Sequence, residues 1–283
     1  MEKKFNTYLT ICSLLILASC SIAGSWVYER ADSYLADYFK EYANFSNEQK
    51  IEIEEITENY LDWFTRNELP EIRAILEDLQ GINNKSTNAL IKNTYLRGQG
   101  LFERTNNYLE GSIIEFSKTL TDLQVNEIKI YFEEIQIKRK ESREKEKNYY
   151  EEVFNDYVSG FRRLNIRLTK DQKEYVKENI KELKDIRSEW SFFQEKWVKE
   201  LIVILNKRDD QNFDKKLTNH LRDLQSLGDS EFQLKLKMNQ DIGIKIISEI
   251  LSKASEKQLN NTKRRIETYI ASIDRILSNR SLQ

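Results

Sequence analysis

Apolar side chains recur at helical spacing along most of the chain, with charged residues between them. The strongest such stripe runs from Tyr175 to Leu201 and predicts one amphipathic helix over about 170–207. Near the start, Trp26 and a group of tyrosines follow the same spacing and predict a helix from Ser25 to Tyr42. The pattern therefore predicts helices that bury one face and expose the other.

Further helices are expected between the few residues that break a helix. The sole proline, Pro70, marks an end or a sharp bend, and Gly98 and Gly100 are expected to loosen the helix that contains them. A nearly continuous charged run at 138–147 is expected to be a solvated part of one long helix. The remaining expected helices cover 46–70, 71–79, 87–116, 121–157, a shorter piece between 210 and 227, 230–251 and 255–277.

The composition favours an all-α fold. Charged residues make up 33% of the chain, with 8 glycines and 1 proline, so strand and turn signals are scarce. The apolar fraction of 39% lies below the usual 45–50% of globular domains. We therefore expect a single helical domain over residues 25–283, an elongated bundle of long amphipathic helices.

A five-residue motif occurs four times and predicts helix starts. The segments 45–49, 120–124, 168–172 and 254–258 each read apolar residue, Ser or Thr, two variable residues, Gln. In a capping box, the hydroxyl accepts a hydrogen bond from the amide three residues later, and the glutamine accepts one from the amide of the capping residue. The predicted capping pairs are Ser46 with Gln49, Thr121 with Gln124, Thr169 with Gln172, and Ser255 with Gln258.

The order of these motifs suggests two pseudo-repeated halves. In each half a capping motif precedes a tryptophan-bearing helix, and a second motif follows it. The corresponding residues are Ser46, Trp63 and Thr121 in the first half, and Thr169, Trp190 and Ser255 in the second.

The N-terminus has the pattern of an export signal. Lys3 and Lys4 precede an apolar run from Leu9 to Leu17, and the segment 17–20 reads Leu-Ala-Ser-Cys. This segment resembles the lipobox that the lipoprotein signal peptidase cuts. Residues 1–19 are then the signal peptide, cleaved between Ser19 and Cys20, and 20–24 form a short anchor segment with lipid on Cys20.

Two other interpretations of this start remain open, a plain secretory signal and a retained membrane helix. The apolar run is shorter than the roughly 20 residues that a membrane span requires. Ser21 follows the cysteine, and under the sorting rule for Gram-negative lipoproteins an aspartate there would favour the inner membrane. We therefore expect the protein at the outer membrane, on its periplasmic face.

Few residue types suited to catalysis or metal binding occur. Cys12 lies in the signal, Cys20 is expected to carry lipid, and His220 is the only histidine, so we expect no metal site and no cofactor. Carboxylate pairs such as Glu54 with Glu58, or Glu133 with Glu134, arise readily on charged helices, and we expect no catalytic residues and no enzyme. The net charge of −2 argues against a nucleic-acid partner, which requires a basic surface.

The capping motifs resemble the Leu-Thr-x-x-Gln motifs of the Spy and CpxP periplasmic stress proteins. That resemblance implies cradle-shaped helical dimers, with ATP-independent chaperoning in one case and stress-kinase damping in the other. A second resemblance, to an uncharacterised family of proteobacterial helical lipoproteins, covers most of the chain and implies location and fold but no activity. It is carried by Cys20-Ser21, the tyrosine-rich first helix, Phe45-Ser46-x-x-Gln49, Trp63 and Arg66-x-Glu68-Leu69-Pro70.

Three functions follow from these observations. The first is a non-catalytic protein-binding or chaperone-like lipoprotein, held to the membrane through Cys20, with exposed aromatic faces that take an envelope protein as partner or client. The second is a structural scaffold lipoprotein that makes coiled-coil contacts along Glu133–Tyr157. The third, remote alternative is a hydrolase of the cell envelope. A contiguous exposed apolar patch would favour the first.

Overall fold

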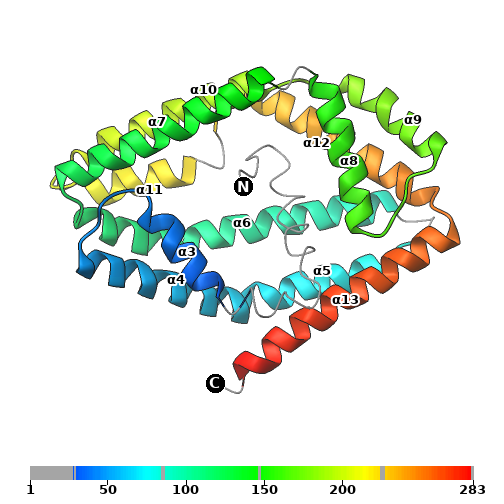
Figure 1. Ribbon diagram of the computed structural model, residues 1–283, viewed down its shortest axis with the longest axis horizontal. Coiled ribbons are helices and arrows are strands. Elements are labelled where there is room, and N and C mark those ends of the chain that lie inside the picture. Colours follow the sequence, from blue (N-terminus) through cyan, green and yellow to red (C-terminus); the bar gives the residue numbers. More distant parts are fainter. Residues whose placement is uncertain (1–27, 29, 84–86, 146–147, 224–226, 282–283) are drawn as a thin grey trace.

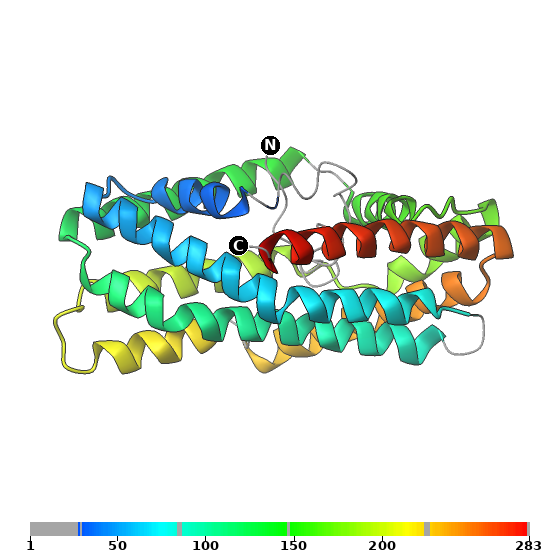
Figure 2. The same cartoon turned by 90° about the horizontal axis from the view of Figure 1, so that it is seen from below.

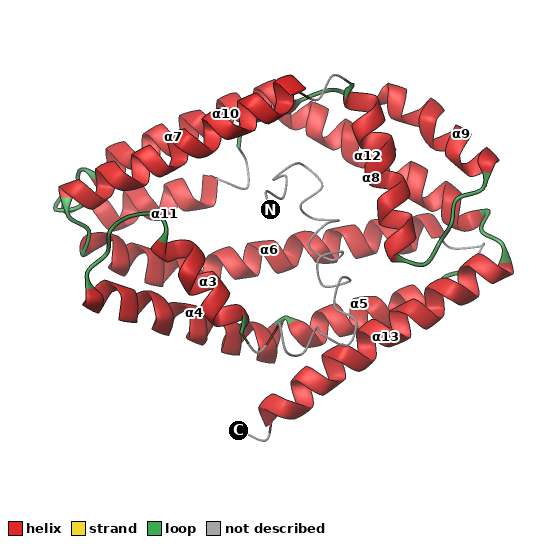
Figure 3. Cartoon of the chain, in the orientation of Figure 1, coloured by secondary structure: helices red, strands yellow, loops and turns green. Residues whose placement is uncertain are grey.

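A computed structural model describes residues 28, 30–83, 87–145, 148–223 and 227–281 (Figure 1). Within these ranges every regular element is helical, which confirms the all-α prediction (Figure 3). The helices are α3 (Ala31–Lys40), α4 (Asn47–Asn67), α5 (Leu69–Gln80), α6 (Thr87–Lys118), α7 (Asp122–Lys145), α8 (Tyr149–Arg163), α9 (Lys170–Asn179), the 3₁₀ helix η1 (Ile180–Glu182), α10 (Arg187–Leu205), α11 (Phe213–Asp223), α12 (Ser230–Ser252) and α13 (Glu256–Ser281).

The helices form an elongated assembly. One end contains the start of α4, the connection from α6 to α7, and α11; the other contains α8, α9 and the connection from α12 to α13 (Figure 1). Seen from below, α3, α7 and α8 lie along one face, and α6 and α11 lie along the other (Figure 2).

The two halves of the chain pack in a reciprocal way. In the first half, α7 follows the second capping motif and packs on α10 of the second half. In the second half, α13 follows the second capping motif and packs on α5 of the first half. The two preceding long helices, α6 and α12, pack against each other. Figure 1 shows the α7–α10 and α5–α13 pairs on opposite edges of the molecule. Each half therefore contributes its last helix to the other half.

The predicted helix over 170–207 is wrong, because the chain breaks between η1 and α10. Leu183 and Ile186 are both buried at the break. Asn239 of α12 accepts a 2.8 Å hydrogen bond from the Lys184 amide and donates one of 2.8 Å to the Lys184 carbonyl. These bonds satisfy backbone groups that a continuous helix would have paired internally. As a consequence, Trp190 lies in α10 and not in the capped helix α9, unlike Trp63 in the capped helix α4.

The predicted helix over 121–157 is also two helices, α7 and α8. Asn148 caps the start of α8, where its side-chain oxygen accepts a 3.3 Å hydrogen bond from the Glu151 amide. Asparagine is a strong helix-capping residue, so Asn148 is a sequence signal for a helix start. The charged run before it led us to expect a continuous helix instead. The stretch Glu133–Tyr157 is therefore not one continuous rod for a coiled coil.

The other expected boundaries agree more closely with the structure. Pro70 lies in the first turn of α5, where its missing amide costs no helical hydrogen bond. The expected loosening is absent, since α6 continues through Gly98 and Gly100 as one helix. Of the helix expected over 25–42, the structure describes residue 28 and residues 30–42, in which α3 covers Ala31–Lys40.

Three apolar clusters hold the helices together. One lies at the α4–α7 end and includes Val125 and Phe213. A second lies at the α8–α9 end and includes Val176 and Ile246, and a third joins α5, α6 and α13 around Ile75. No described helix combines the length and apolar character needed to cross a membrane.

Candidate functional site

The predicted capping residues of the first half meet across the fold. The Nε2 atom of Gln49 donates to Oε1 of Gln124 at 3.1 Å, and Nε2 of Gln124 donates to Oε1 of Gln49 at 2.7 Å. Each Oε1 also accepts the amide of its own capping residue, Ser46 at 2.9 Å and Thr121 at 3.0 Å. The hydroxyls of Ser46 and Thr121 accept the amides of their glutamines at 3.2 Å. The motif thus caps a helix and also joins two helix starts.

The second half has a related arrangement at the other end of the molecule, in which one bond joins the two glutamines and Gln172 donates instead to the Ile250 carbonyl. Gln258 Nε2 donates to Gln172 Oε1 at 3.0 Å, while the hydroxyls of Thr169 and Ser255 cap their helices. Gln258 also donates to the carbonyl of Arg167, two residues before Thr169. In the first half, each glutamine likewise reaches the carbonyl two residues before its partner's capping residue, Thr119 for Gln49 and Asn44 for Gln124. These residues fix the architecture and carry no reactive group.

The other residues singled out in the sequence are those of the N-terminal segment and two carboxylate pairs. Ser19, Cys20 and Trp26 fall outside the described residues. The carboxylates of Glu54, Glu58, Glu133 and Glu134 are exposed on α4 and α7. No group of three or more His, Cys, Asp or Glu side chains suited to a metal ion occurs within the described ranges.

His220 of α11 contacts Trp197 of α10 and joins the two helices. Its ring stacks on Trp197 with centroids 4.5 Å apart, and Nε2 lies 3.0 Å from the Trp197 carbonyl oxygen. Trp197 in turn donates its indole N–H to the His220 carbonyl at 3.0 Å. Burial lowers the pKa of His220 below its ordinary value, as expected of a structural, neutral histidine.

A shallow, open hollow lies between the starts of α10 and α12. It has a volume of about 400 Å³ and is lined by Ser188, Glu189, Phe192, Phe193, Asp229, Glu231 and Phe232. Phe192 at its edge is 61% exposed, whereas Phe232 is buried. A volume of this size falls within the range of small-ligand pockets, so the hollow can take one or two large side chains.

Local sequence explains why Phe232 forms one wall of the hollow. Asp229 accepts a 2.8 Å hydrogen bond from the Phe232 amide and so begins α12. Gly228 precedes it with φ of 98°. A Cβ there would lie 2.4 Å from Cδ1 of Phe232. Glycine therefore supplies both the left-handed backbone and the space for the ring.

The aromatic rings of the hollow form a connected array. The Phe193 ring lies 5.3 Å from Phe192 and 5.0 Å from Phe232, measured between centroids. Trp190 lies behind them, 5.8 Å from Phe232, and its buried indole N–H has no hydrogen-bond acceptor among the described residues. The array extends from the buried interior to the exposed Phe192 ring.

Three carboxylates, those of Glu189, Asp229 and Glu231, form the acidic rim of the hollow beside these rings. Lys235 lies between two of them, with Nζ 2.6 Å from Glu189 and 2.8 Å from Glu231. These hydrogen bonds, that of Glu189 first, raise the pKa of Lys235, which therefore stays charged. Three carboxylates and one ammonium leave the rim with a negative balance.

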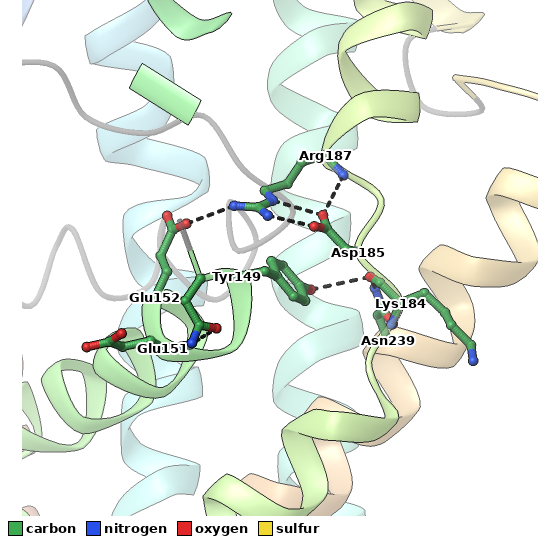
Figure 4. Close-up of polar contacts among 8 residues, drawn as sticks. Tyr149, Glu151, Glu152, Lys184, Asp185, Arg187 and Asn239 are labelled. Atoms are coloured by element: carbon green, nitrogen blue, oxygen red, sulfur yellow. Dashed lines mark hydrogen bonds and ion pairs between the residues drawn. The ribbon is translucent and has the colours of Figure 1, made fainter. Parts of the chain in front are cut away.

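A separate ionic network fixes the chain next to the hollow (Figure 4). Arg187 donates to Asp185 at 2.8 Å and 2.6 Å and to Glu152 at 3.3 Å, and its guanidinium lies 4.7 Å from the Tyr149 ring centroid. The Tyr149 hydroxyl donates to the Lys184 carbonyl at 3.3 Å, and burial raises the pKa of Tyr149 to about 12. The network holds the start of α8 against the loop before α10. It also pairs the Arg187 guanidinium with Asp185 and Glu152, which do not line the hollow.

Sequence reasoning missed the hollow, because it assigned Phe193 and Trp190 to one buried stripe. A usable signal was present in the adjacent pair Phe192-Phe193. Neighbouring residues on a helix project about 100° apart, so two adjacent phenylalanines rarely share one buried face. Phe232 is brought to them only by the fold.

Searches of curated proteins and of solved structures gave no significant match. Residues 41–233 match a family of unknown function, DUF6279. This segment contains both halves of the first capping pair and every residue that lines the hollow. The match agrees with the expected membership of an uncharacterised family: the chain belongs to the DUF6279 family of unknown function.

Proposed function

We propose that the protein is a lipid-anchored, non-catalytic factor that binds other proteins, in the manner of a chaperone, through the hollow between α10 and α12. The observation that carries the proposal is the exposed Phe192 ring, continuous with Phe193 and the buried Phe232. Energetically dominant residues of protein interfaces are typically aromatic side chains in packed pockets at the centre of the contact. An array with a buried base and an exposed edge suits a partner that inserts its own apolar side chain.

The proposed location follows from the N-terminal sequence. The apolar run, the Leu-Ala-Ser-Cys segment and Ser21 support lipid on Cys20 and the periplasmic face of the outer membrane. A protein held there meets envelope proteins before they reach their final folded or inserted state. An exposed aromatic site then has clients within reach.

A scaffold that tethers an envelope assembly is the second candidate, favoured by one observation on α7. Leu123, Ile130 and Ile137 are exposed at intervals of seven residues and form one apolar line along the helix. Such a heptad line is typical of a helix that pairs with another helix.

Binding of an unfolded protein tests the proposal directly. The mature lipidated protein, reconstituted in vesicles, is mixed with a reduced and alkylated model protein that stays unfolded without denaturant, and co-sedimentation is measured. We expect binding of the unfolded form and not of the same protein in its native form. Phe192→Ser should weaken it about tenfold, whereas Val203→Ser, 57% exposed on the same helix but outside the hollow, should not. Equal binding by both variants would refute the assignment of the site.

The location has its own test in cells. Cys20→Ala should prevent lipid labelling and release the protein from outer-membrane fractions. Tight membrane association of this variant would show that a segment other than the lipid is the anchor.

A further inference from the structure

We infer that the hollow between α10 and α12 selects protein segments in which a cationic side chain stands next to a large apolar one. This inference rests on the proposed protein-binding function and adds the chemical class of the bound segment. It follows from three properties of the hollow: its aromatic rings, the charge of its rim and the accessibility of one carboxylate.

The aromatic rings of the hollow supply two kinds of contact. The ring faces and edges of Phe192 and Phe193 offer apolar area to an inserted Phe, Leu or Met side chain. The exposed face of Phe192 also attracts a cation, because the centre of an aromatic ring carries negative potential. A segment that carries both side chains can therefore make both the apolar contact and the cation–ring contact with the same surface.

The charge of the rim favours a cation over an anion. Glu189, Asp229 and Glu231 contribute three negative charges, and Lys235 contributes one positive charge. The first turns of α10 and α12 line the hollow, and each helix start is equivalent to about half a positive charge. The balance remains about −1, and the nearby Arg187 does not change it, because Asp185 and Glu152 hold its guanidinium.

One carboxylate of the rim is open to an incoming cation. The Glu231 side chain is 77% exposed although it pairs with Lys235. A carboxylate has about four acceptor positions, so Glu231 can hold Lys235 and a ligand ammonium or guanidinium together. Glu189 is less exposed and contacts the same ammonium from α10, so Lys235 holds the two carboxylates close together.

Three labelled peptides of equal length test the inference. They share one phenylalanine and differ at the neighbouring position, which is lysine, glutamine or glutamate. Fluorescence anisotropy is measured with the mature lipidated protein in phosphatidylcholine vesicles, and protein-free vesicles serve as the blank. We expect the lysine peptide to bind about five- to tenfold more tightly than the glutamine peptide, the glutamate peptide to bind most weakly, and the difference to shrink with added salt.

Two carboxylate variants separate the rim from the rest of α10 and α12. Glu231→Gln should reduce the preference for lysine to about twofold and leave binding of the glutamine peptide unchanged. The matched control Glu195→Gln removes an exposed carboxylate of α10 that pairs with Lys199 outside the hollow, and it should preserve the full preference. Melting curves of both variants verify that the fold is intact.

The outcomes distinguish the inference from the function on which it rests. Failure of all three peptides to bind would overturn the protein-binding function itself. Equal affinity for the three peptides, or the tightest binding by the glutamate peptide, would overturn the charge selection and leave protein binding standing. Loss of the preference in Glu195→Gln as well as Glu231→Gln would show that general charge, and not the hollow, is responsible.

Discussion

The paired amides of Gln49 and Gln124 should be energetically coupled. Replacing Gln124 with leucine, which has a similar volume, removes both bonds to Gln49, the acceptor for the Thr121 amide and the donor to the Asn44 carbonyl. Both glutamines are buried, so water cannot fully replace these bonds. The variant tests whether the motif acts across the fold or only within its own helix.

The expected magnitude follows from the number of bonds. At about 0.5–1.5 kcal/mol of net stability for each of the four hydrogen bonds, Gln124→Leu should lower the free energy of unfolding by about 2–6 kcal/mol. Gln49→Leu should have a similar effect, since it also loses the bonds to Thr119 and Ser46. The two mutual bonds are lost in either single variant. The double variant should therefore lose less than the sum of the two single variants, by about 1–3 kcal/mol.

Urea denaturation followed by circular dichroism measures all four proteins of this cycle. Gln211→Leu is the matched control, because Gln211 is exposed in the loop before α11, and its free energy of unfolding should change by less than about 0.5 kcal/mol. Additivity of the two single variants within about 0.5 kcal/mol would refute the coupling. The motifs would then act as local caps only.

Three further predictions concern single contacts. Asn239→Leu should cost about 1–3 kcal/mol and loosen the break before α10, as shown by faster hydrogen exchange there, because both bonds to the loop backbone are lost. Arg104→Ala should lower the free energy of unfolding by about 2–4 kcal/mol in thermal unfolding, because it leaves the buried Glu68 carboxylate without its two 2.7 Å bonds. We expect this loss to exceed that of Asn239→Leu, and a smaller loss would contradict the reasoning. Because burial lowers the pKa of His220, the unfolded chain binds a proton more readily, so stability present above pH 6.5 should decline as the pH falls through the lowered pKa. His220→Phe should remove that part of the decline in a series of urea midpoints, and an unchanged pH profile would speak against it.

Features encoded by neighbouring residues were predictable from sequence. The four capping boxes each lie within five residues, so their hydrogen bonds follow from local geometry. The all-helical class followed from the periodicity and the scarcity of glycine and proline. In contrast, the pairing of Gln49 with Gln124 depends on where the fold places two helix starts.

Features set by tertiary contacts were not predictable in this way. The break before α10 contains neither glycine nor proline, and it is held open by Asn239, which is distant in sequence. The hollow needs Phe192 from one helix and Phe232 from another, together with the glycine that lets the loop approach. Periodicity identifies a stripe of apolar residues, but it does not tell which of them another helix will cover.

Crosslinking in living cells shows whether this protein binds other proteins through the hollow. A photoreactive phenylalanine analogue is placed at Phe192 of the full-length protein, and at Val203 of α10 as the exposed control. We expect crosslinks to envelope proteins from position 192, enriched in segments that carry a cationic residue beside an apolar one, and few crosslinks from position 203. Equal crosslinking from the two positions, or none from position 192, would contradict it.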